Sequence, residues 1–536
     1  MDNALVDTPW DVLVIGGGIT GAGIARDAAM RGLRTALIDK GDFGHGTSSH
    51  SSRLIHGGVR YLETYEFGLV IESSHERRVL LKIAPHLVRP LAFVFPVYRG
   101  GRVPAWQLRA GMWLYDLLAA FRNVKRHRWL SAKNVRSVEP GVRDKGLKGA
   151  AFYYDAQVDD ARLVIATIRA ATRAGAVAAS YVEATALLKP DGRIRGAAIR
   201  DVLTGETANV RANVVVNATG PWSDGVRRLD DPNAKPTLRP TKGAHVFVPQ
   251  RRMSNQHAVT LFSPIDGRVM FVLPWGELSY IGTTDTDADS SPDDLRVTSA
   301  DVTYLLRSAN AAFPDARLTT NDVISGWAGL RPLLRHDEGS PSSVSREHFI
   351  EESAQGLVSI VGGKLTTYRL MARDVVDRVA KRLHQLDGRP VAPHAPTGSE
   401  ALPGGETTDL EVLVEAARAR GAPDATARHL VRSYGSEAAA VLNLVDRDRG
   451  LGQPIVAGRP EIWAEVDYAV EREMALRVQD VLIRRLHLFY ETRDQGQSVA
   501  GAVADRMKKL LGWDETREAE ELRDYGQMVE RGRIKV

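Results

Sequence analysis

The first 40 residues alternate between apolar runs and a glycine cluster in the pattern of a βαβ unit. Residues 11–15 form an apolar run, residues 16–21 read Gly-Gly-Gly-Ile-Thr-Gly, and residues 35–38 form a second apolar run that ends at Asp39. This order predicts a strand, a tight glycine turn, a helix over residues 19–30 and a second strand. Such a unit binds a dinucleotide pyrophosphate at the helix N-terminus, and a carboxylate at position 39 suits FAD or NAD better than NADP. The candidate cofactor-binding residues here are Gly16, Gly18, Gly21 and Asp39.

Further along the chain the pattern changes to strands and then to helices. A helix is expected over residues 66–83, and alternating apolar positions with Asp-Gly turns at 191–192 and 266–267 predict strands between about 185 and 284. We expect a mostly antiparallel, substrate-binding sheet over roughly residues 185–330, inserted into a dinucleotide-binding domain that spans residues 1–386.

The last third of the chain is expected to be a separate helical domain. Residues 387–405 are rich in proline and glycine, which indicates a linker, and residues 406–536 follow as the helical domain. Apolar residues recur there at spacings of three and four, which predicts one buried face of a long helix. These residues are Trp463, Val466, Val470, Met474, Val478 and Val481. The predicted fold class is α/β plus α+β, with a Rossmann-like domain, an antiparallel-sheet domain and C-terminal helices.

Composition narrows the chemistry. The 536 residues suggest two or three domains, and 43% hydrophobic with 26% charged residues is ordinary for a globular chain. No run of about 18 apolar residues occurs and the N-terminus is acidic, so we expect a cytosolic chain. The absence of cysteine excludes disulfides, thiolate metal sites, Fe–S clusters and a cysteinyl flavin, so redox chemistry requires a bound cofactor. A net charge of +5 favours anionic substrates or lipid head groups, and no basic block indicates nucleic acid.

Three further segments favour a flavin over a nicotinamide. Residues 47–58 place hydroxyls and small residues just after Asp39, where they can bond a pyrophosphate and ring heteroatoms. Residues 213–220 form an apolar strand ending in Ala-Thr-Gly, which would return to the dinucleotide fold near the cofactor. Residues 361–367 resemble the end of a P-loop, but Val358 stands where that motif requires glycine, so nucleotide hydrolysis is disfavoured. The candidate cofactor-binding residues of these segments are Thr47, Ser48, Ser49, Ser51, Ser52, Arg53, Gly57, Gly58, Ala218, Thr219, Gly220, Gly363, Lys364 and Leu365.

Taken together, the motifs resemble the FAD-dependent glycerol-3-phosphate dehydrogenases of the aerobic, respiratory type over nearly the whole chain. The most specific is the run Ser-Ser-x-Leu-Ile-His-Gly-Gly-x-Arg-Tyr-Leu-Glu at residues 51–63. The other matching segments are residues 16–23, 47–49, 217–222, 242–245, 281–285, 329–332 and 362–369. One departure is Arg53, where relatives often carry lysine, which leaves the role of that residue open.

The resemblance implies FAD as cofactor, oxidation of sn-glycerol 3-phosphate to dihydroxyacetone phosphate, and electron transfer to a membrane quinone. A phosphate dianion requires a cationic clamp, and Arg60, Arg331 and Lys364 match family positions around the flavin. Hydride loss from C2 also requires a base for the hydroxyl proton. His245 is the first candidate, since nearby cations would keep it neutral, and His56 in the flavin loop is the second. The residues expected to orient substrate hydroxyls are Tyr61 and Thr366.

Residues 104–129 are the candidate membrane contact. Trp106, Trp113, Leu117, Phe121 and Val124 fall near one helical face, and a basic cluster follows at residues 122–128. Aromatic residues beside terminal cations are typical of an interfacial helix, although a core helix with a basic end fits equally well. The respiratory role implied by the resemblance favours peripheral attachment to the cytoplasmic face of the cell membrane. A homodimer is the expected assembly.

Other functions remain open on sequence grounds. One is a glycerol-phosphate oxidase that uses oxygen, and another is an amino-acid or 2-hydroxy-acid oxidase of the same fold. A third, from a different class, is a nucleotide-binding module without catalysis. No metal site is expected, because the histidines at positions 45, 50 and 56 match no common ligand spacing.

Overall fold

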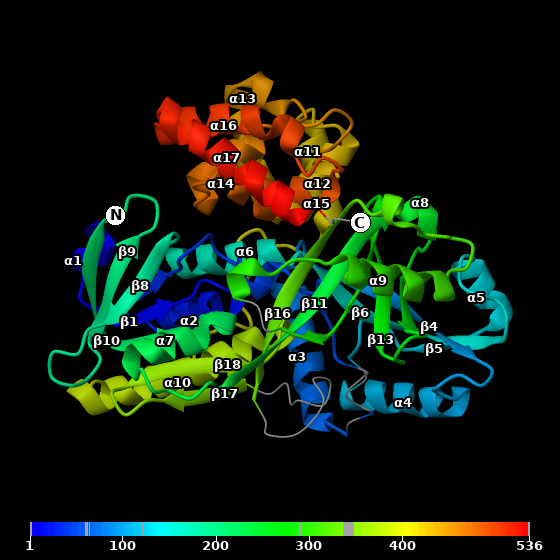
Figure 1. Cartoon of the computed structure of the whole chain (residues 1–536), viewed down its shortest axis with the longest axis horizontal. Coiled ribbons are helices and arrows are strands. Elements are labelled where there is room, and N and C mark those ends of the chain that lie inside the picture. Colours follow the sequence, from blue (N-terminus) through cyan, green and yellow to red (C-terminus); the bar gives the residue numbers. More distant parts are fainter. Residues whose placement is uncertain are drawn as a thin grey trace.

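Two β-sheets lie side by side along the long axis of the molecule, and the C-terminal helices lie over them on one side (Figure 1). The computed structural model describes residues 3–58, 63, 65–120, 122–288, 291–335 and 348–533.

The first sheet is built on the predicted βαβ unit. Its strands lie in the order β17 (His348–Glu352), β18 (Leu357–Gly362), β10 (Thr207–Asn217), β1 (Trp10–Ile15), β2 (Thr35–Ile38) and β7 (Val177–Ala179). Strands β18, β10, β1, β2 and β7 are parallel, and the hairpin β8 (Val182–Leu187) and β9 (Gly196–Asp201) joins through β9. The apolar runs of β1 and β2 are buried along their whole length, as in parallel sheets that helices cover on both faces.

The second sheet is mostly antiparallel, as the sequence predicts, but its boundaries differ from the expected 185–330. Its strands lie in the order β15 (Thr286–Asp287), β11 (Leu238–Pro249), β14 (Leu278–Gly282), β13 (Val269–Trp275), β12 (Ala258–Phe262), β4 (Val88–Tyr98), β6 (Leu147–Val158) and β3 (Leu54–Ile55), with β16 (Ser325–Leu334) on β11 and β5 (Arg128–Ser131) on β6. Four of these strands precede residue 185, whereas the hairpin at Gly192 belongs to the first sheet. Pairings between segments this far apart in the chain leave no local signal in the sequence.

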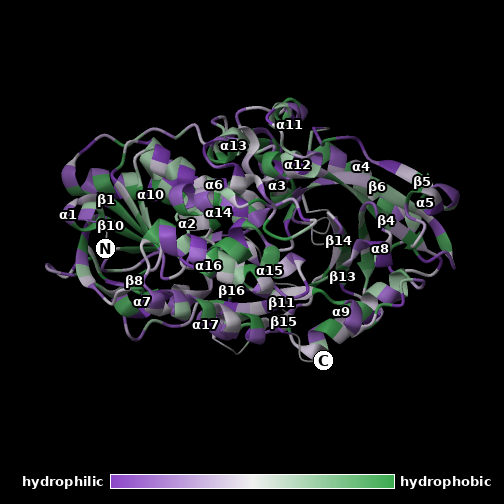
Figure 2. Ribbon diagram, turned by 90° about the horizontal axis from the view of Figure 1, so that it is seen from above, coloured by the Kyte–Doolittle hydropathy of each residue, from purple (hydrophilic) through white to green (hydrophobic). Residues whose placement is uncertain are grey.

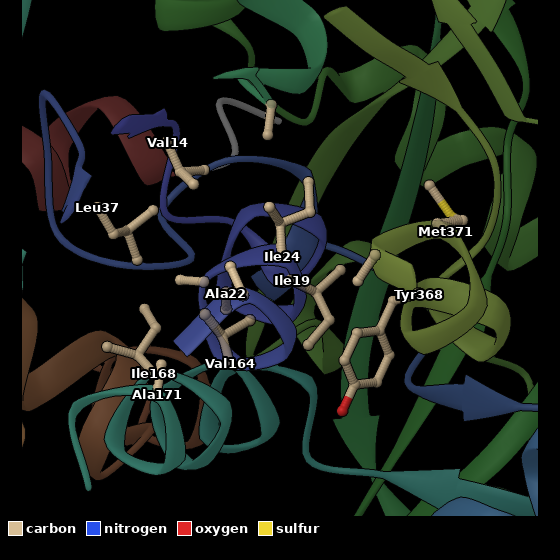
Figure 3. Packing of buried hydrophobic residues seen from close by; sticks show 14 of the residues in the cluster. Val14, Ile19, Ala22, Ile24, Leu37, Val164, Ile168, Ala171, Tyr368 and Met371 are labelled. Carbon is tan, nitrogen blue, oxygen red and sulfur yellow. The ribbon is translucent and has the colours of Figure 1, made fainter. Parts of the chain in front are cut away.

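Helices cover both faces of the first sheet. Helix α2 (Ile19–Met30) packs between α6 (Asp160–Arg173) and α10 (Tyr368–Asp387). Figure 3 shows the buried side chains that join these three helices to β1 and β2. On the opposite face, α1 (Asn3–Asp7) and α7 (Ser223–Asp230) pack on the other side chains of the same strands.

The C-terminal domain is helical, but the predicted long helix is wrong. Helix α14 (Ala464–Glu473) ends at Met474, whose φ of 56° is left-handed, and a π-helix follows at Asp480–Arg485. The Asp480 carboxylate accepts hydrogen bonds from the backbone N–H groups of Leu476 and Arg477, at 3.0 and 2.9 Å, which starts the new helix at a different angle. The other helices of the domain are α11 (Leu410–Ala419), α12 (Asp424–Tyr434), α13 (Ala438–Arg447), α15 (Leu488–Glu491), α16 (Gln497–Leu511) and α17 (Glu515–Gly532). From above, α14, α15 and α16 lie over the centre of the molecule, near β11 and β16 (Figure 2).

On the side opposite the C-terminal domain lie α3 (Phe67–Ile83) and α4 (Ala105–Leu118) (Figure 1). Helix α4 is shorter than the expected interfacial helix over 104–129. The Asp116 carboxylate accepts from Asn123 Nδ2 at 2.6 Å and from the His127 backbone, which turns the basic segment back toward β5, and Val124 lies beyond the helix. Phe121 lies outside the described residues. Within the described ranges, no helix combines the length and apolarity needed to cross a bilayer.

The remaining elements are short or peripheral. The α-helices are α5 (Ala132–Val138), α8 (Gln250–Met253) and α9 (Ser299–Ala312), and the 3-10 helices are η1 (Thr47–Ser49), η3 (Gly220–Trp222), η4 (Pro292–Asp294), η5 (Thr320–Asp322), η7 (Leu365–Thr367), η8 (Gly435–Glu437) and η9 (Arg449–Gly452).

Candidate active site

A cavity of about 480 Å³ begins where the parallel strands of the first sheet end and extends to the second sheet. Strands β1, β10 and β18 all run the same way, so the segments after Ile15, Asn217 and Gly362 meet at one edge. Cofactors in open α/β sheets bind at this edge.

The glycine turn after β1 shapes the first end of the cavity. Gly16 has a φ of 108°, and a Cβ there would lie 2.6 Å from the carbonyl oxygen of Ala218. A Cβ on Gly21 would lie 1.8 Å from the carbonyl oxygen of Gly16, so Gly21 permits close packing and does not itself line the cavity. The N-cap residue of α2 is Gly18, which supplies no side-chain hydrogen bond to the first turn. The helix N-terminus therefore presents backbone N–H groups and a positive dipole to the cavity.

Asp39 lies at the end of β2 and lines the same part of the cavity. Its two carboxylate oxygens accept from the backbone N–H groups of Gly17, at 2.6 Å, and Gly41, at 2.9 Å. A carboxylate has about four lone-pair positions, so these two bonds leave acceptors for ribose hydroxyls.

The loop that follows contributes hydroxyls that already have protein partners. Thr47 Oγ1 donates to the carbonyl of Leu330 at 2.6 Å, and Ser48 Oγ accepts from the backbone N–H of Ile19 at 2.9 Å. Ser51 Oγ donates to Asp160 Oδ2 at 2.6 Å. These contacts hold the loop against β16 and against helices α2 and α6.

At the far end of the cavity, His245 of β11 is held on three sides. Its ring stacks on Trp327 with centroids 4.9 Å apart, and Nε2 lies 2.9 Å from Ser52 Oγ. A Cβ on Gly282 would lie 1.9 Å from His245 Cδ2, so the neighbouring strand must carry glycine there. Burial lowers the pKa of His245 well below its usual value, and the charges of Arg331 and Arg53 lower the pKa further. The imidazole is therefore neutral near pH 7.

Two cations lie in the cavity wall, and one of them, Arg331, acts on His245. Arg331 of β16 donates through NH1 to Asp285 Oδ1 at 3.0 Å and through NH2 to Thr283 Oγ1 at 3.0 Å. A Cβ on Gly243 would lie 2.3 Å from Arg331 NH2, so glycine lets the guanidinium lie flat on β11. Lys364 follows two glycines with left-handed φ values at the end of β18, and it also lines the cavity. Both cations therefore line the cavity in which a dianionic group would bind.

Two family models match the chain. Residues 11–378 match the family described as FAD dependent oxidoreductase, and residues 395–518 match the C-terminal domain of alpha-glycerophosphate oxidase. An aerobic glycerol-3-phosphate dehydrogenase of Staphylococcus haemolyticus is 36% identical over 535 residues, which cover 98% of this chain and 95% of the relative. A glycerol-3-phosphate dehydrogenase of Synechocystis sp. is 37% identical over 551 residues, which cover 98% of each protein.

A solved structure agrees with the sequence relatives. The glycerol-3-phosphate dehydrogenase from Bacillus halodurans, complexed with FAD, superposes with a TM-score of 0.82 at 32% identity and covers 99% of this chain and 96% of its own. This chain belongs to the FAD-dependent glycerol-3-phosphate dehydrogenase family. FAD is its cofactor, and the glycine turn, the N-terminus of α2 and Asp39 fit a flavin dinucleotide.

Most of the residues that the sequence suggested for this family line the cavity. They are Gly16, Gly18, Asp39, Thr47, Ser48, Ser51, Ser52, His56, Ala218, Thr219, Gly220, His245, Arg331, Gly363, Lys364, Leu365 and Thr366. Thr366 Oγ1 accepts from the backbone N–H of His56 at 3.4 Å, which joins η7 to the segment after β3. Arg60 and Tyr61 lie outside the described residues.

Other expected cofactor residues lie behind the cavity wall. Ser49 is buried with Oγ 3.2 Å from His50 Nδ1, and Gly57 packs under the hydroxyl of Tyr115. Gly58 does not line the cavity either.

Arg53 departs most from expectation: its guanidinium is buried among aromatic rings, and Nε lies 3.9 Å from Asp160 Oδ1. The rings around it belong to Phe247, Trp275, Trp327 and Tyr490, with centroids 4.5–5.9 Å from Cζ.

Several residues of the site were not expected from the sequence. His50 lines the cavity, with Nδ1 donating to the carbonyl of Gly46 at 2.7 Å and Nε2 3.2 Å from the hydroxyl of Tyr490. Burial lowers the pKa of His50 to about 4. Asp285, which orients Arg331, belongs to the segment 281–285 that matched the family, so that motif could have indicated it. Trp222 and Lys40 also line the cavity, and the Lys40 ammonium lies 4.6 Å from the Trp222 ring centroid.

Proposed function

We propose that this protein oxidises sn-glycerol 3-phosphate to dihydroxyacetone phosphate. The observation that carries the proposal is that Arg331 and Lys364 lie with a neutral histidine in the wall of one cavity, whose other end is a dinucleotide turn. The named activities of the relatives support the same substrate. Bound FAD would accept the hydride that leaves C2.

The protein groups have separate tasks in this proposal. Arg331 offers two N–H donors in a fixed plane and Lys364 a point charge, and together they hold the phosphate so that C2 faces the flavin. His245 takes up the proton of the C2 hydroxyl as the C–H bond breaks: Ser52 Oγ, 2.9 Å from Nε2, accepts that proton and passes its own to Nε2. His56 is the second candidate base. We also propose that Thr366, Arg60 and Tyr61 contact the substrate.

The test is the visible spectrum of the anaerobic holoenzyme before and after addition of sn-glycerol 3-phosphate. Bleaching of the oxidised flavin band is expected at micromolar to millimolar substrate, as is usual for enzymes. Glycerate is the matched control, because it replaces the phosphate ester with a carboxylate and should leave the band unchanged. Bleaching by glycerate alone would favour a 2-hydroxy-acid oxidase, and no bleaching by any small alcohol would favour a non-catalytic module.

We further propose that electrons pass to a membrane quinone and that the protein binds the cytoplasmic membrane face through α3 and α4. Large apolar side chains are exposed on these adjoining helices: Trp106 at 73%, Trp113 at 61%, Leu117 at 58% and Ile71 at 50%. Exposed cations at positions 122, 125 and 126 follow α4 and suit anionic lipid. Replacing Trp106 and Trp113 with serine should abolish sedimentation with anionic vesicles, and replacing the exposed Val412 on α11 with serine should not.

Oxygen is the second candidate acceptor. The observation that favours oxygen is the match of residues 395–518 to a domain named after alpha-glycerophosphate oxidase. Reoxidation of the substrate-reduced enzyme should be compared in air and in anaerobic buffer with a soluble quinone. Faster reoxidation by the quinone supports the dehydrogenase, and stoichiometric peroxide in air supports the oxidase. The homodimer remains a prediction, which sedimentation equilibrium tests.

A further inference from the structure

The segment that follows β2 and includes η1 (residues 39–50, here the cofactor loop) has little other regular structure, although it forms much of the cofactor end of the cavity. Residues 44–48 line the cavity. Phe43 is fully buried beneath the glycine turn, where a Cβ on Gly17 would lie 2.5 Å from its ring. The Gly44 N–H donates to the carbonyl of Gly17 at 3.0 Å. The position of this loop therefore determines the position of the wall around the dinucleotide.

Asp42, also in the cofactor loop, points away from that cavity and into the C-terminal domain. Arg485 donates to both carboxylate oxygens, through NH1 at 2.6 Å and through NH2 at 2.9 Å, and Arg484 donates through Nε to Oδ2. Both arginines belong to the π-helix that interrupts the expected long helix. Three hydrogen bonds thus join the loop to residues more than 400 positions away in the chain.

The two arginines are themselves held in place. Arg484 NH2 donates to Asp480 Oδ1 at 2.9 Å, and Arg485 NH2 donates to the carbonyl of Glu473 at 2.8 Å. Asp42, Asp480 and both arginines are buried. Burial alone would raise the pKa of Asp42, but Arg485 and Arg484 outweigh burial and lower the pKa to about 2. Asp42 is therefore ionised at neutral pH, whereas burial and the charge of Asp42 raise the pKa of Asp480 to about 6. Removing the Asp42 charge leaves the buried arginines without their shared partner.

We propose that the C-terminal helical domain retains FAD by holding the cofactor loop through Asp42, Arg484 and Arg485. No described residue beyond Met371 lines the cavity, so the domain acts on the cofactor through the loop and not by contact. Asp42 is a positioning residue in this arrangement. A loop that loses its ion pairs can move Gly44, His45 and Thr47 away from the glycine turn and open the cofactor end of the cavity. The proposal requires FAD but is independent of the substrate.

The test compares Asp42→Asn with a matched control, Glu437→Gln, in the holoenzyme. Both replace a carboxylate that pairs with arginines across the domain interface by its isosteric amide. Glu437 accepts from Arg169 and Arg173 of α6 and contacts neither the cofactor loop nor Arg484 and Arg485. Both variants should melt at lower temperature than the wild type. Only Asp42→Asn should release FAD faster, by roughly tenfold or more, because a buried charge left unpaired opens the loop. Flavin fluorescence after dilution, well below both melting temperatures, measures the release rate.

A second variant covers the case in which Asp42→Asn does not fold. Arg484→Lys keeps the positive charge and can still reach one oxygen, so FAD release should be accelerated by a smaller factor than in Asp42→Asn, roughly threefold. Equal acceleration by Asp42→Asn and Glu437→Gln would overturn the proposal, since it would reflect general loosening of the interface. Unchanged release in the folded Asp42 or Arg484 variant would also overturn it. Because no substrate is added, neither result depends on the proposed oxidation of glycerol 3-phosphate.

Discussion

The two ends of the cavity are built in different ways. At the cofactor end, backbone N–H groups and the absence of Cβ atoms do most of the shaping, and the decisive residues lie between Gly16 and Asp39. At the substrate end, the chemistry lies in the side chains of His245, Arg331 and Lys364, which come from two strands of the second sheet and from the end of β18. The first end should therefore be sensitive to added atoms, and the second to changed functional groups.

The largest expected effect is at the cofactor end, in Gly16→Ala. The new Cβ would lie 2.6 Å from the carbonyl oxygen of Ala218, and φ is 108°, so β1 and β10 would have to move apart. Steric strain of about 3 kcal/mol or more should weaken FAD binding roughly 100-fold, as measured by quenching of flavin fluorescence.

Gly32→Ala is the matched control for this glycine. Gly32 also has a left-handed φ, of 80°, but a Cβ there would meet nothing within 4 Å. The substitution should cost about 1 kcal/mol of stability and leave FAD affinity unchanged. If both alanine variants bind FAD as the wild type does, the backbone does not shape the cofactor end as we describe.

His245→Ala should have the largest effect at the substrate end. The variant should retain FAD, because the side chain contacts Ser52 and Trp327 and not the glycine turn. Removing a general base should slow anaerobic flavin reduction at saturating substrate by roughly 10²–10⁴-fold, as measured by stopped-flow absorbance. His56→Ala serves as the comparison. If flavin reduction is slow in His56→Ala and normal in His245→Ala, then His56 is the base and His245 is not.

Arg331→Lys should have an intermediate effect. Lysine cannot contact Asp285, Thr283 and a phosphate at once, so the substrate loses about 1.5–3 kcal/mol of charge-assisted hydrogen bonding, or roughly 10–100-fold in kcat/KM. Arg239→Lys, on β11 and paired with the exposed Asp287, should change nothing. Steady-state kinetics of both variants test whether Arg331 binds the phosphate. If kcat/KM is the same in Arg331→Lys and Arg239→Lys, Arg331 does not belong to the clamp.

The difference between the two ends of the cavity also explains which parts of the structure could be predicted from the sequence. The βαβ unit was predictable because its contacts are local: strand, turn, helix and carboxylate follow one another, and α2 begins and ends at the expected Ile19 and Met30. The contact of Ser52 with His245 joins residues 193 positions apart, so no spacing rule contains it.

The surroundings of Arg53 and Met474 also could not be predicted, because they depend on contacts with distant parts of the chain. Arg53 was expected at the cofactor because it is a cation in a glycine-rich loop, but rings from three distant strands and from α15 bury it instead. The periodicity around Met474 predicts one helix, yet Glu473 and Asp480 bond to groups in the first domain and split that helix in two. Contacts with distant segments outweighed the local pattern at both positions: aromatic rings at Arg53, and hydrogen bonds on either side of Met474.

The smallest expected effect concerns the charges behind His245. Burial and the cations Arg331 and Arg53 lower the pKa of His245, and His50 adds to this effect when protonated. A base acts only when it is neutral, so a lowered pKa should keep the rate of flavin reduction constant to below the ordinary titration range of histidine, near pH 6.5. Arg53→Met removes one cation and should move the acidic fall in rate to higher pH, with roughly a few-fold loss of rate at pH 5.5. Arg53→Lys keeps the charge and should retain the wild-type profile.

Because Arg53 also offsets the buried Asp160, melting temperatures of both variants must be measured beside the pH profiles. A lower melting temperature with an unshifted profile would assign Arg53 to packing alone, and a shifted profile that lysine restores would make it part of the electrostatic environment of the base.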